Sequence, residues 1–202
     1  IRLIQLAATD DPSFIEIAGI IENDPAFSYE ILRIANSAYY GLAKKVHSIR
    51  NALLVIGLNE LKKWLYITFL SYGKQKGKPD ELIKVSILRG RFLESLASLG
   101  GRPELSAEMM TIGMFSLLDV LFDRPMEDAL QELNLSNEIL QVLLGTGRGF
   151  GSTCLNIALS YEKGDWQKVS AYADQLSIPP SAITCAYLNS LKALNAMNLN
   201  LH

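Results

Sequence analysis

Residues able to hold a metal ion or act as a nucleophile are scarce in this sequence of 202 residues. It contains two histidines, His47 and His202, and two cysteines, Cys154 and Cys185. Zinc and di-iron sites recruit several histidines with carboxylates or cysteines, and none of their usual spacings occurs here. Carboxylates alone can bind magnesium, but no pattern specifies such a site. We therefore expect neither a protein metal site nor a bound cofactor.

Nucleophilic catalysis has equally thin support. Cys154 or a serine could pair with His47, because the members of a catalytic triad need not be adjacent in sequence. No G-x-S-x-G turn is present, so a core thiol and a loop imidazole are the favoured interpretation. Both cysteines are predicted to be buried thiols in a reducing compartment, because two do not make a disulfide framework.

Asp119 stands out among the acids because it interrupts the most apolar stretch, Met109–Phe122. A buried carboxylate is unfavourable in its charged form unless it is hydrogen-bonded or ion-paired. We expect Asp119 at a helix edge, bonded to a neighbouring N–H group or to an arginine. A ligand role for this carboxylate is the alternative.

A glycine-rich segment spans residues 145–151. It fits neither of the common phosphate-binding patterns, and no strand precedes it. The segment is predicted to be a flexible turn, with Ser152 or Thr153 capping the following helix. Arg148 beside that helix N-terminus is a candidate anion site.

Basic residues are concentrated between Lys44 and Lys78, where eight of them face one acid, Glu60, for a net charge of +7. The whole chain carries a net charge of -2 and has a pI near 5.7, which argues against nucleic-acid binding. The stretch is either a solvated basic face balanced by acids from elsewhere or a docking surface for an acidic partner or a phosphate. Its aromatic residues are predicted to belong to the core.

The elements that must position these residues are predicted to be helices throughout. Apolar residues recur at three- and four-residue steps, and helix-start signals precede them at Asp11, Asp24, Ser48, Pro79–Glu81 and Ser136. Glycines tend to follow these runs, as C-terminal caps do. Residues 109–122 are apolar on nearly every side, which indicates a helix at the centre of a bundle. The fold class is therefore all-α.

Composition bounds the organisation of the chain. Hydrophobic residues make up 49% and charged residues 20%, a balance typical of folded proteins. We expect one domain over 1–202, with a core of 12–145 and a C-terminal helical subdomain of 146–202. No signal peptide or membrane span is predicted, which favours the cytoplasm. The first residue, Ile1, suggests a fragment of a longer protein.

Residues 24–41, DPAFSYEILRIANSAYYG, and 47–61, HSIRNALLVIGLNEL, resemble the two signature segments of HDOD domains. The Asn36-Ser37 pair, Gly41 and the Gly57-Leu58 spacing carry the resemblance. It implies an HD-domain-like multi-helix bundle, related to the HD phosphohydrolases. The tail around residues 164–166 resembles proteins in which this domain follows an EAL domain of bacterial cyclic-di-GMP signalling.

The resemblance also identifies the positions at which HD phosphohydrolases bind their metal. Val85 falls where the first histidine would be, and Ser116 and Leu117 fall where the His-Asp pair would be. Valine and leucine cannot ligate a metal, and a neutral serine is a poor substitute. The resemblance therefore implies a bundle without the HD metal site, and this domain is not expected to be an enzyme.

These observations together predict a non-catalytic signalling module that acts through protein–protein contacts, beside an EAL-type domain of the same protein. The candidate interaction surface comprises Asn36, Ser37, Lys44, Lys45 and Arg50, although Asn36 could equally satisfy backbone groups at a helix end. The partner's identity and any self-association are left open, and no nucleic acid or membrane is expected. The alternatives are a residual metal-dependent phosphohydrolase with atypical ligands and a nucleotide sensor.

Overall fold

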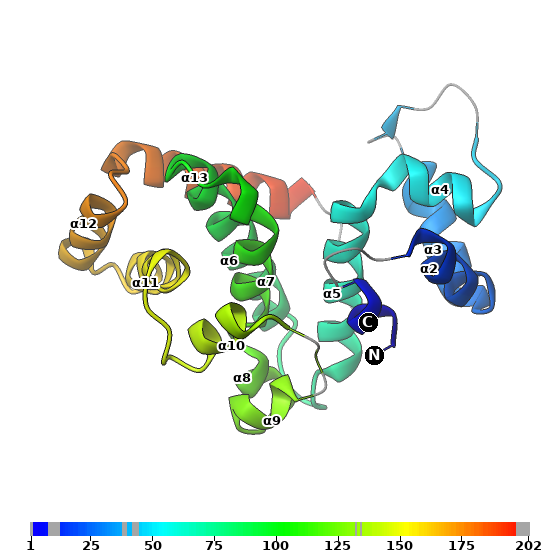
Figure 1. Ribbon diagram of the computed structural model, residues 1–202, viewed down its shortest axis with the longest axis horizontal. Coiled ribbons are helices and arrows are strands. Elements are labelled where there is room, and N and C mark those ends of the chain that lie inside the picture. The colour runs from blue at the N-terminus through cyan, green and yellow to red at the C-terminus, as the bar shows by residue number, and fades with distance from the viewer. Residues whose placement is uncertain are drawn as a thin grey trace. The chain divides into compact units, whose positions relative to one another are not determined.

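The computed structural model describes residues 2–7, 13–37, 40–41, 45–131, 133 and 135–196. Every regular element in these ranges is a helix, which confirms the all-α prediction (Figure 1). The chain forms two compact units, Ile1–Phe69 and Leu70–His202. We describe each unit by itself.

The first unit is built from short helices that begin at the predicted caps. The Asp24 carboxylate accepts hydrogen bonds from the N–H groups of Ala26 and Phe27, at 2.9 and 3.2 Å, and Ser48 caps the next helix in the same way. The start predicted at Asp11 lies outside the described residues. The helices are α1 (Arg2–Ala7), α2 (Phe14–Glu22), α3 (Pro25–Ala35), α4 (Ile49–Ile56) and most of α5 (Leu58–Gly73).

Helices α2, α3 and α4 pack against one another around fully buried aliphatic side chains, including Ile17, Ile31 and Leu53. Between α4 and α5 the chain turns at Gly57, whose φ of 76° lies in a region that residues with a Cβ rarely adopt. The predicted glycine stop is therefore confirmed at this position.

The second unit is centred on two helices, α6 (Glu81–Leu99) and α7 (Ser106–Phe115), which lie side by side (Figure 1). Two later helices, α11 (Phe150–Glu162) and α13 (Pro180–Ala196), pack against α6, and α12 (Trp166–Gln175) packs against α11. The remaining elements are η2 (Pro103–Leu105), α8 (Leu118–Phe122), α9 (Met126–Leu130) and α10 (Asn137–Leu143).

The expected continuous helix over 109–122 is wrong, because the chain breaks between α7 and α8 at Ser116 and Leu117. The Ser116 hydroxyl donates a hydrogen bond to the Gly113 carbonyl at 2.7 Å. A side chain that bonds the backbone in this way competes with the helical ladder. The break places Ser116 and Asp119 on separate elements.

The apolar segment Pro103–Phe122 satisfies a membrane-spanning helix by length and composition alone, and 56% of its best window is buried inside the protein. Within the described residues it is interrupted at the break after α7. Its apolar character follows from its central place in the unit.

The C-terminal helices share one core with α6. Phe92 and Leu96 of α6 pack in the same buried cluster as Ile157 of α11 and Ile183 of α13. The contacts therefore divide the chain after Phe69, whereas the sequence suggested a subdomain boundary at 145/146. Cys154 belongs to this core as predicted, but Cys185 is exposed, so the prediction that both thiols are buried is wrong for Cys185.

Candidate functional site

The candidate site lies in the second unit, where α6 and α7 come unusually close together. A Cβ placed on Gly113 of α7 would lie 2.5 Å from the Cα of Gly90 on α6, so only glycine fits at Gly113. This close approach brings Arg89, next to Gly90, within reach of the chain that leaves the end of α7.

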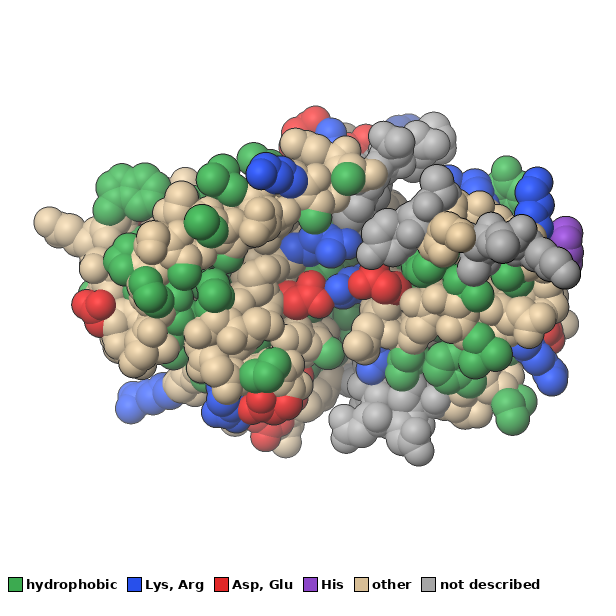
Figure 2. All heavy atoms as spheres, turned by 90° about the horizontal axis from the view of Figure 1, so that it is seen from above, with side chains coloured by type: hydrophobic (Ala, Val, Ile, Leu, Met, Phe, Trp, Pro, Cys, Tyr) green, Lys and Arg blue, Asp and Glu red, His purple; other side chains and the backbone are tan. Residues whose placement is uncertain are grey.

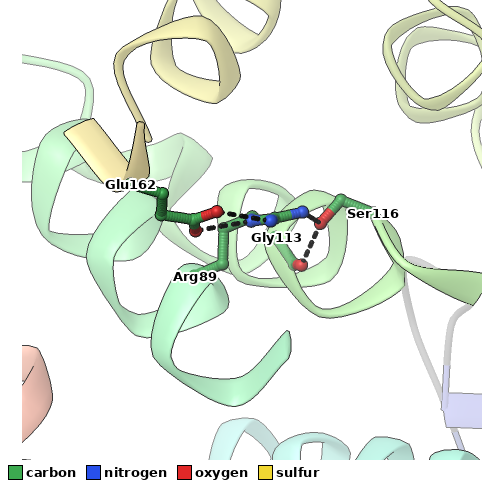
Figure 3. A network of polar contacts seen from close by, with 4 residues as sticks. All are labelled: Arg89, Gly113, Ser116 and Glu162. Carbon is green, nitrogen blue, oxygen red and sulfur yellow. Dashed lines mark hydrogen bonds and ion pairs between the residues drawn. The ribbon is translucent and has the colours of Figure 1, made fainter. Parts of the chain in front are cut away.

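Arg89 is 5% exposed and forms the centre of a polar network (Figure 3). Its Nε and Nη2 atoms donate to the two carboxylate oxygens of Glu162 on α11, at 2.9 and 2.6 Å. Its Nη1 atom donates to the Ser116 hydroxyl at 2.6 Å, and that hydroxyl donates to the Gly113 carbonyl. Together these bonds join α6, the break after α7 and the end of α11.

The network satisfies a charge that would otherwise be very costly to bury. A bidentate Arg–carboxylate pair has the favourable geometry that offsets part of the desolvation of both ions. Glu162 retains 25% of its side-chain exposure, so its desolvation is partial. The Arg89 charge is therefore fixed in place and neutralised within the protein.

A cavity of about 350 Å³ opens beside this network. Its polar lining comes from Arg89, Ser116 and three further side chains, namely Asp119, Ser152 and Asn156. The rest of the lining is apolar or glycine: Met126, Val142, Leu143, Gly145, Gly147, Leu155 and Leu159. The elements that contribute are α6, α8, α9, α10 and α11, together with the break after α7 and the loop after α10.

Sequence reasoning found two residues of this site and missed the rest of the network. Ser116 and Asp119 were singled out, and the structure brings both to the cavity. Arg89 and Glu162 were not. The available signal was Arg89 itself, a charged residue one helical turn after Val85 on a helix whose buried side chains are mostly apolar. Glu162 is 73 residues away in the chain, so no local pattern indicates it.

Asp119 differs from the expected arrangement. It is half-buried and lines the cavity, but its carboxylate makes no hydrogen bond or ion pair with any described residue. Only its backbone carbonyl is used, as the acceptor for the Asp123 and Arg124 N–H groups. The prediction that Asp119 is bonded to a neighbouring N–H or arginine is therefore wrong.

The predicted caps of the glycine-rich segment also differ. Helix α11 begins at Phe150 with Gly149 as its N-cap, and neither Ser152 nor Thr153 caps it. The Thr153 hydroxyl instead donates to the Gly149 carbonyl, and the Ser152 hydroxyl is buried without a hydrogen-bond partner. Arg148, the candidate anion residue, is exposed and does not line the cavity.

Cys154, the candidate nucleophile, lies in surroundings that disfavour its thiolate. Burial raises the pKa of the Cys154 thiol to about 12, which disfavours the reactive thiolate. The interpretation of Cys154 as a thiol of the hydrophobic core therefore agrees with its surroundings.

The candidate interaction surface belongs to the first unit, and its members have different roles there. Asn36 donates to the carbonyls of Leu32 and Val46 and accepts from the Val46 N–H, so its side chain fastens the following loop to the end of α3. Ser37, Lys45 and Arg50 are exposed. Lys44 lies outside the described residues.

Acids compensate part of the charge of the basic stretch. Three of its lysines are paired with acids: Lys63 with Glu60, Lys74 with Asp80, and Lys78 with Asp123. The stretch also crosses the division between the two units. Figure 2 shows Lys and Arg side chains of the whole chain at several separate places on the face in view. Its aromatic residues are buried at Tyr66 and Phe69, as predicted, but Tyr72 is 83% exposed.

Comparison with known proteins identifies the class first through the fold. A solved structure from Shewanella amazonensis SB2B, provisionally named as a metal-dependent phosphohydrolase, covers 96% of this chain and 88% of its own, with a TM-score of 0.58 and 17% identity. The chain is thus an all-α protein with an HD-like phosphohydrolase fold. The family described as HDOD domain matches residues 1–141, and the chain belongs to that family.

Two curated proteins are similar along most of the chain. YuxH of Bacillus subtilis (strain 168) is 35% identical over 193 residues, covering 95% of this chain and 46% of YuxH. The cyclic di-GMP phosphodiesterase CdgJ of Vibrio cholerae serotype O1 is 27% identical over 175 residues, covering 87% of this chain and 40% of CdgJ. The chain spans less than half the length of either relative.

The residues present do not fit the metal that an HD-like fold implies. Among the described residues, no group of three or more His, Cys, Asp or Glu side chains could hold a metal ion. At the expected ligand positions, Val85 and Leu117 offer no donor atom, and the Ser116 hydroxyl already accepts a bond from the Arg89 guanidinium.

Proposed function

We propose that this chain is a non-catalytic regulatory module of a cyclic-di-GMP signalling protein, and that it acts through contacts with other protein domains. The observation that supports the proposal is the Arg89–Ser116–Glu162 network, in which a guanidinium donates to Ser116, a position that the family resemblance assigns to a metal ligand. The name of CdgJ supports the signalling context.

The partner in this proposal is an EAL-type domain of the same longer protein. The relatives' extra length leaves room for such a domain, since this chain matches 46% and 40% of them. Lys45 and Arg50, with Ser37 and Lys44, form the contact surface that we favour. Arg50 has only a long ion pair with Glu22, at 3.7 Å, so its charge stays largely available.

Hydrolysis assays test the absence of catalysis. The purified chain is incubated with manganese, magnesium or iron(II) and either cyclic di-GMP or bis(p-nitrophenyl) phosphate. We expect turnover no faster than the buffer with metal alone. Metal-dependent hydrolysis that is lost in Asp119→Asn would instead establish the residual phosphohydrolase.

Charge reversal tests the contact surface. In the full-length protein, Lys44→Glu with Lys45→Glu is expected to change cyclic-di-GMP hydrolysis at least threefold, while the melting temperature of this domain stays nearly constant. Lys192→Glu, an exposed lysine of α13, is the matched control and should change neither. Equal effects of the two substitutions would remove this surface from consideration.

A further inference from the structure

The cavity beside Arg89 contains polar side chains that the protein leaves unsatisfied. The Asp119 carboxylate and the Asn156 amide make no hydrogen bond with any described residue, and the Ser152 hydroxyl is buried without a partner. Polar groups removed from water are normally hydrogen-bonded, so the buried Ser152 hydroxyl calls for a ligand or ordered water, and the half-buried Asp119 and Asn156 side chains beside it have hydrogen-bonding capacity to offer the same ligand. Arg89 and Ser116, in contrast, are already bonded within the protein.

The charges that line the cavity favour a positively charged ligand. Glu162 neutralises Arg89 through two hydrogen bonds of 2.9 and 2.6 Å. The Asp119 carboxylate has no ion-pair partner within 4.0 Å among the described residues, so one negative charge remains uncompensated at the cavity wall. A half-buried carboxylate favours a cation and disfavours an anion.

The lining residues of the cavity favour a ligand that is partly apolar. Ser152, Leu155, Asn156 and Leu159 follow one another along one face of α11, which alternates polar and apolar contacts. Met126, Val142 and Leu143 add further apolar surface. A volume of about 350 Å³ is at the lower end of small-molecule sites, which are mostly apolar with a few polar groups that fix orientation.

We propose that this cavity binds a small organic cation with an amidinium or guanidinium head and an apolar body. The two parallel N–H groups of the head pair with the two oxygens of Asp119, as they do in an Arg–carboxylate pair. The body lies against Leu155, Leu159 and Met126. Ser152 and Asn156 supply hydrogen bonds at its edge. This site goes beyond the proposed regulatory function and does not depend on it.

Calorimetry on the purified chain with benzamidine as the probe tests this site. Benzoate has the same ring and the opposite charge, and it is the ligand control. We expect benzamidine to bind one site with Kd below 1 mM (roughly -4 kcal/mol), and benzoate not to bind. Absence of binding by benzamidine, or tighter binding of benzoate, would overturn the proposal.

Three substitutions of similar size locate the binding. Asp119→Asn is expected to weaken benzamidine at least tenfold, because it removes the charge and one acceptor. Asp123→Asn lies four residues further on at a surface ion pair and is expected to leave Kd unchanged. Asn156→Leu on α11 is expected to weaken binding about threefold, because it removes a hydrogen bond at the edge of the ligand. Equal affinity in the wild type and in both Asp119→Asn and Asn156→Leu would place the probe elsewhere and reject the site.

Hydrogen exchange provides a readout that does not depend on the variants. Benzamidine should slow exchange in α8 and α11, which line the cavity, and leave α2–α4 unchanged, because no residue of α2–α4 lines it. Protection confined to the first unit would contradict the assignment. The regulatory function is tested separately by hydrolysis in the full-length protein, so either proposal can fail alone.

Discussion

At the scale of single residues, Arg89 determines the character of the site. Its three hydrogen bonds to Ser116 and Glu162 join segments that are distant in sequence. An ion pair of this kind stabilises only when both partners are present, because each alone leaves a charge or polar group poorly compensated.

Substitution of Arg89 therefore tests the network. Arg89→Leu is expected to lower the free energy of unfolding by about 3 kcal/mol, since it removes both hydrogen bonds to the Glu162 carboxylate and the one to the Ser116 hydroxyl. The additional change Glu162→Leu should recover at least half of that loss. Both are measured by urea denaturation.

Lys84→Met is the control, because Lys84 lies on the same helix in an exposed pair with Glu81 at 3.8 Å. Its expected cost is below about 0.5 kcal/mol. A cost for Arg89→Leu as small as this would show that the network contributes little to the fold.

The two cysteines give a second prediction at this scale. At pH 8 a thiol reagent should label Cys185 quickly and Cys154 only after unfolding, because Cys185 is exposed and Cys154 is buried. Fast labelling of both thiols in the native protein, counted by mass spectrometry, would contradict the buried position of Cys154.

The raised pKa of Cys154 also links stability to pH. The folded chain keeps this thiol protonated up to about 12, whereas the unfolded chain loses the proton near 9.0. The contribution of Cys154 is therefore complete below pH 9 and is lost as pH rises from 9 towards 12. Cys154→Val should reduce the fall in stability over this window, and Cys185→Val should not.

At the scale of elements, the contact of α6 with α7 depends on glycine. Gly113→Ala would place a methyl group 2.5 Å from the backbone of Gly90, so the two helices must separate. We expect a loss of about 3 kcal/mol in the free energy of unfolding, as is found for overpacked cores.

The matched substitution is Gly19→Ala on α2, where no atom lies within 4 Å of the added Cβ. This change should stabilise its helix by about 0.5–1 kcal/mol, because alanine is the better helix former. Comparison of Gly113→Ala with Gly19→Ala separates the effect of steric crowding from that of helix propensity. Circular dichroism during denaturation measures the free energy of unfolding of both variants. Similar effects of the two changes would argue against a tight crossing.

At the scale of the whole molecule, the described residues contain no group of side chains that fits a metal ion, and this predicts how the protein responds to metal. A ligand that binds only the native state raises the melting temperature in proportion to its concentration and affinity. Manganese or zinc at 1 mM, and EDTA, are each expected to shift the melting temperature by less than about 1 °C, measured by differential scanning fluorimetry. A rise of several degrees with manganese, reversed by EDTA, would show that a metal site exists.

Local sequence patterns predicted the elements well. The caps at Asp24, Ser48 and Ser136 and the glycine stop at Gly57 were identifiable because each depends on residues a few positions apart. The break at Ser116 was not predicted, because apolar residues continue on both sides and the side chain that stabilises the break comes from Arg89 on another helix.

The sequence alone determined the helical class, the family resemblance and the poverty of metal ligands, because residue types, periodicity and caps are local properties. Only the tertiary structure decided that Arg89 meets Ser116 and Glu162, and that Asp119, Ser152 and Asn156 line one cavity. It also decided which lysines of the basic stretch form ion pairs with acids, as Lys78 does with Asp123. These contacts join residues distant in the chain, and the packing of helices through close approaches such as Gly90 with Gly113 brings them together.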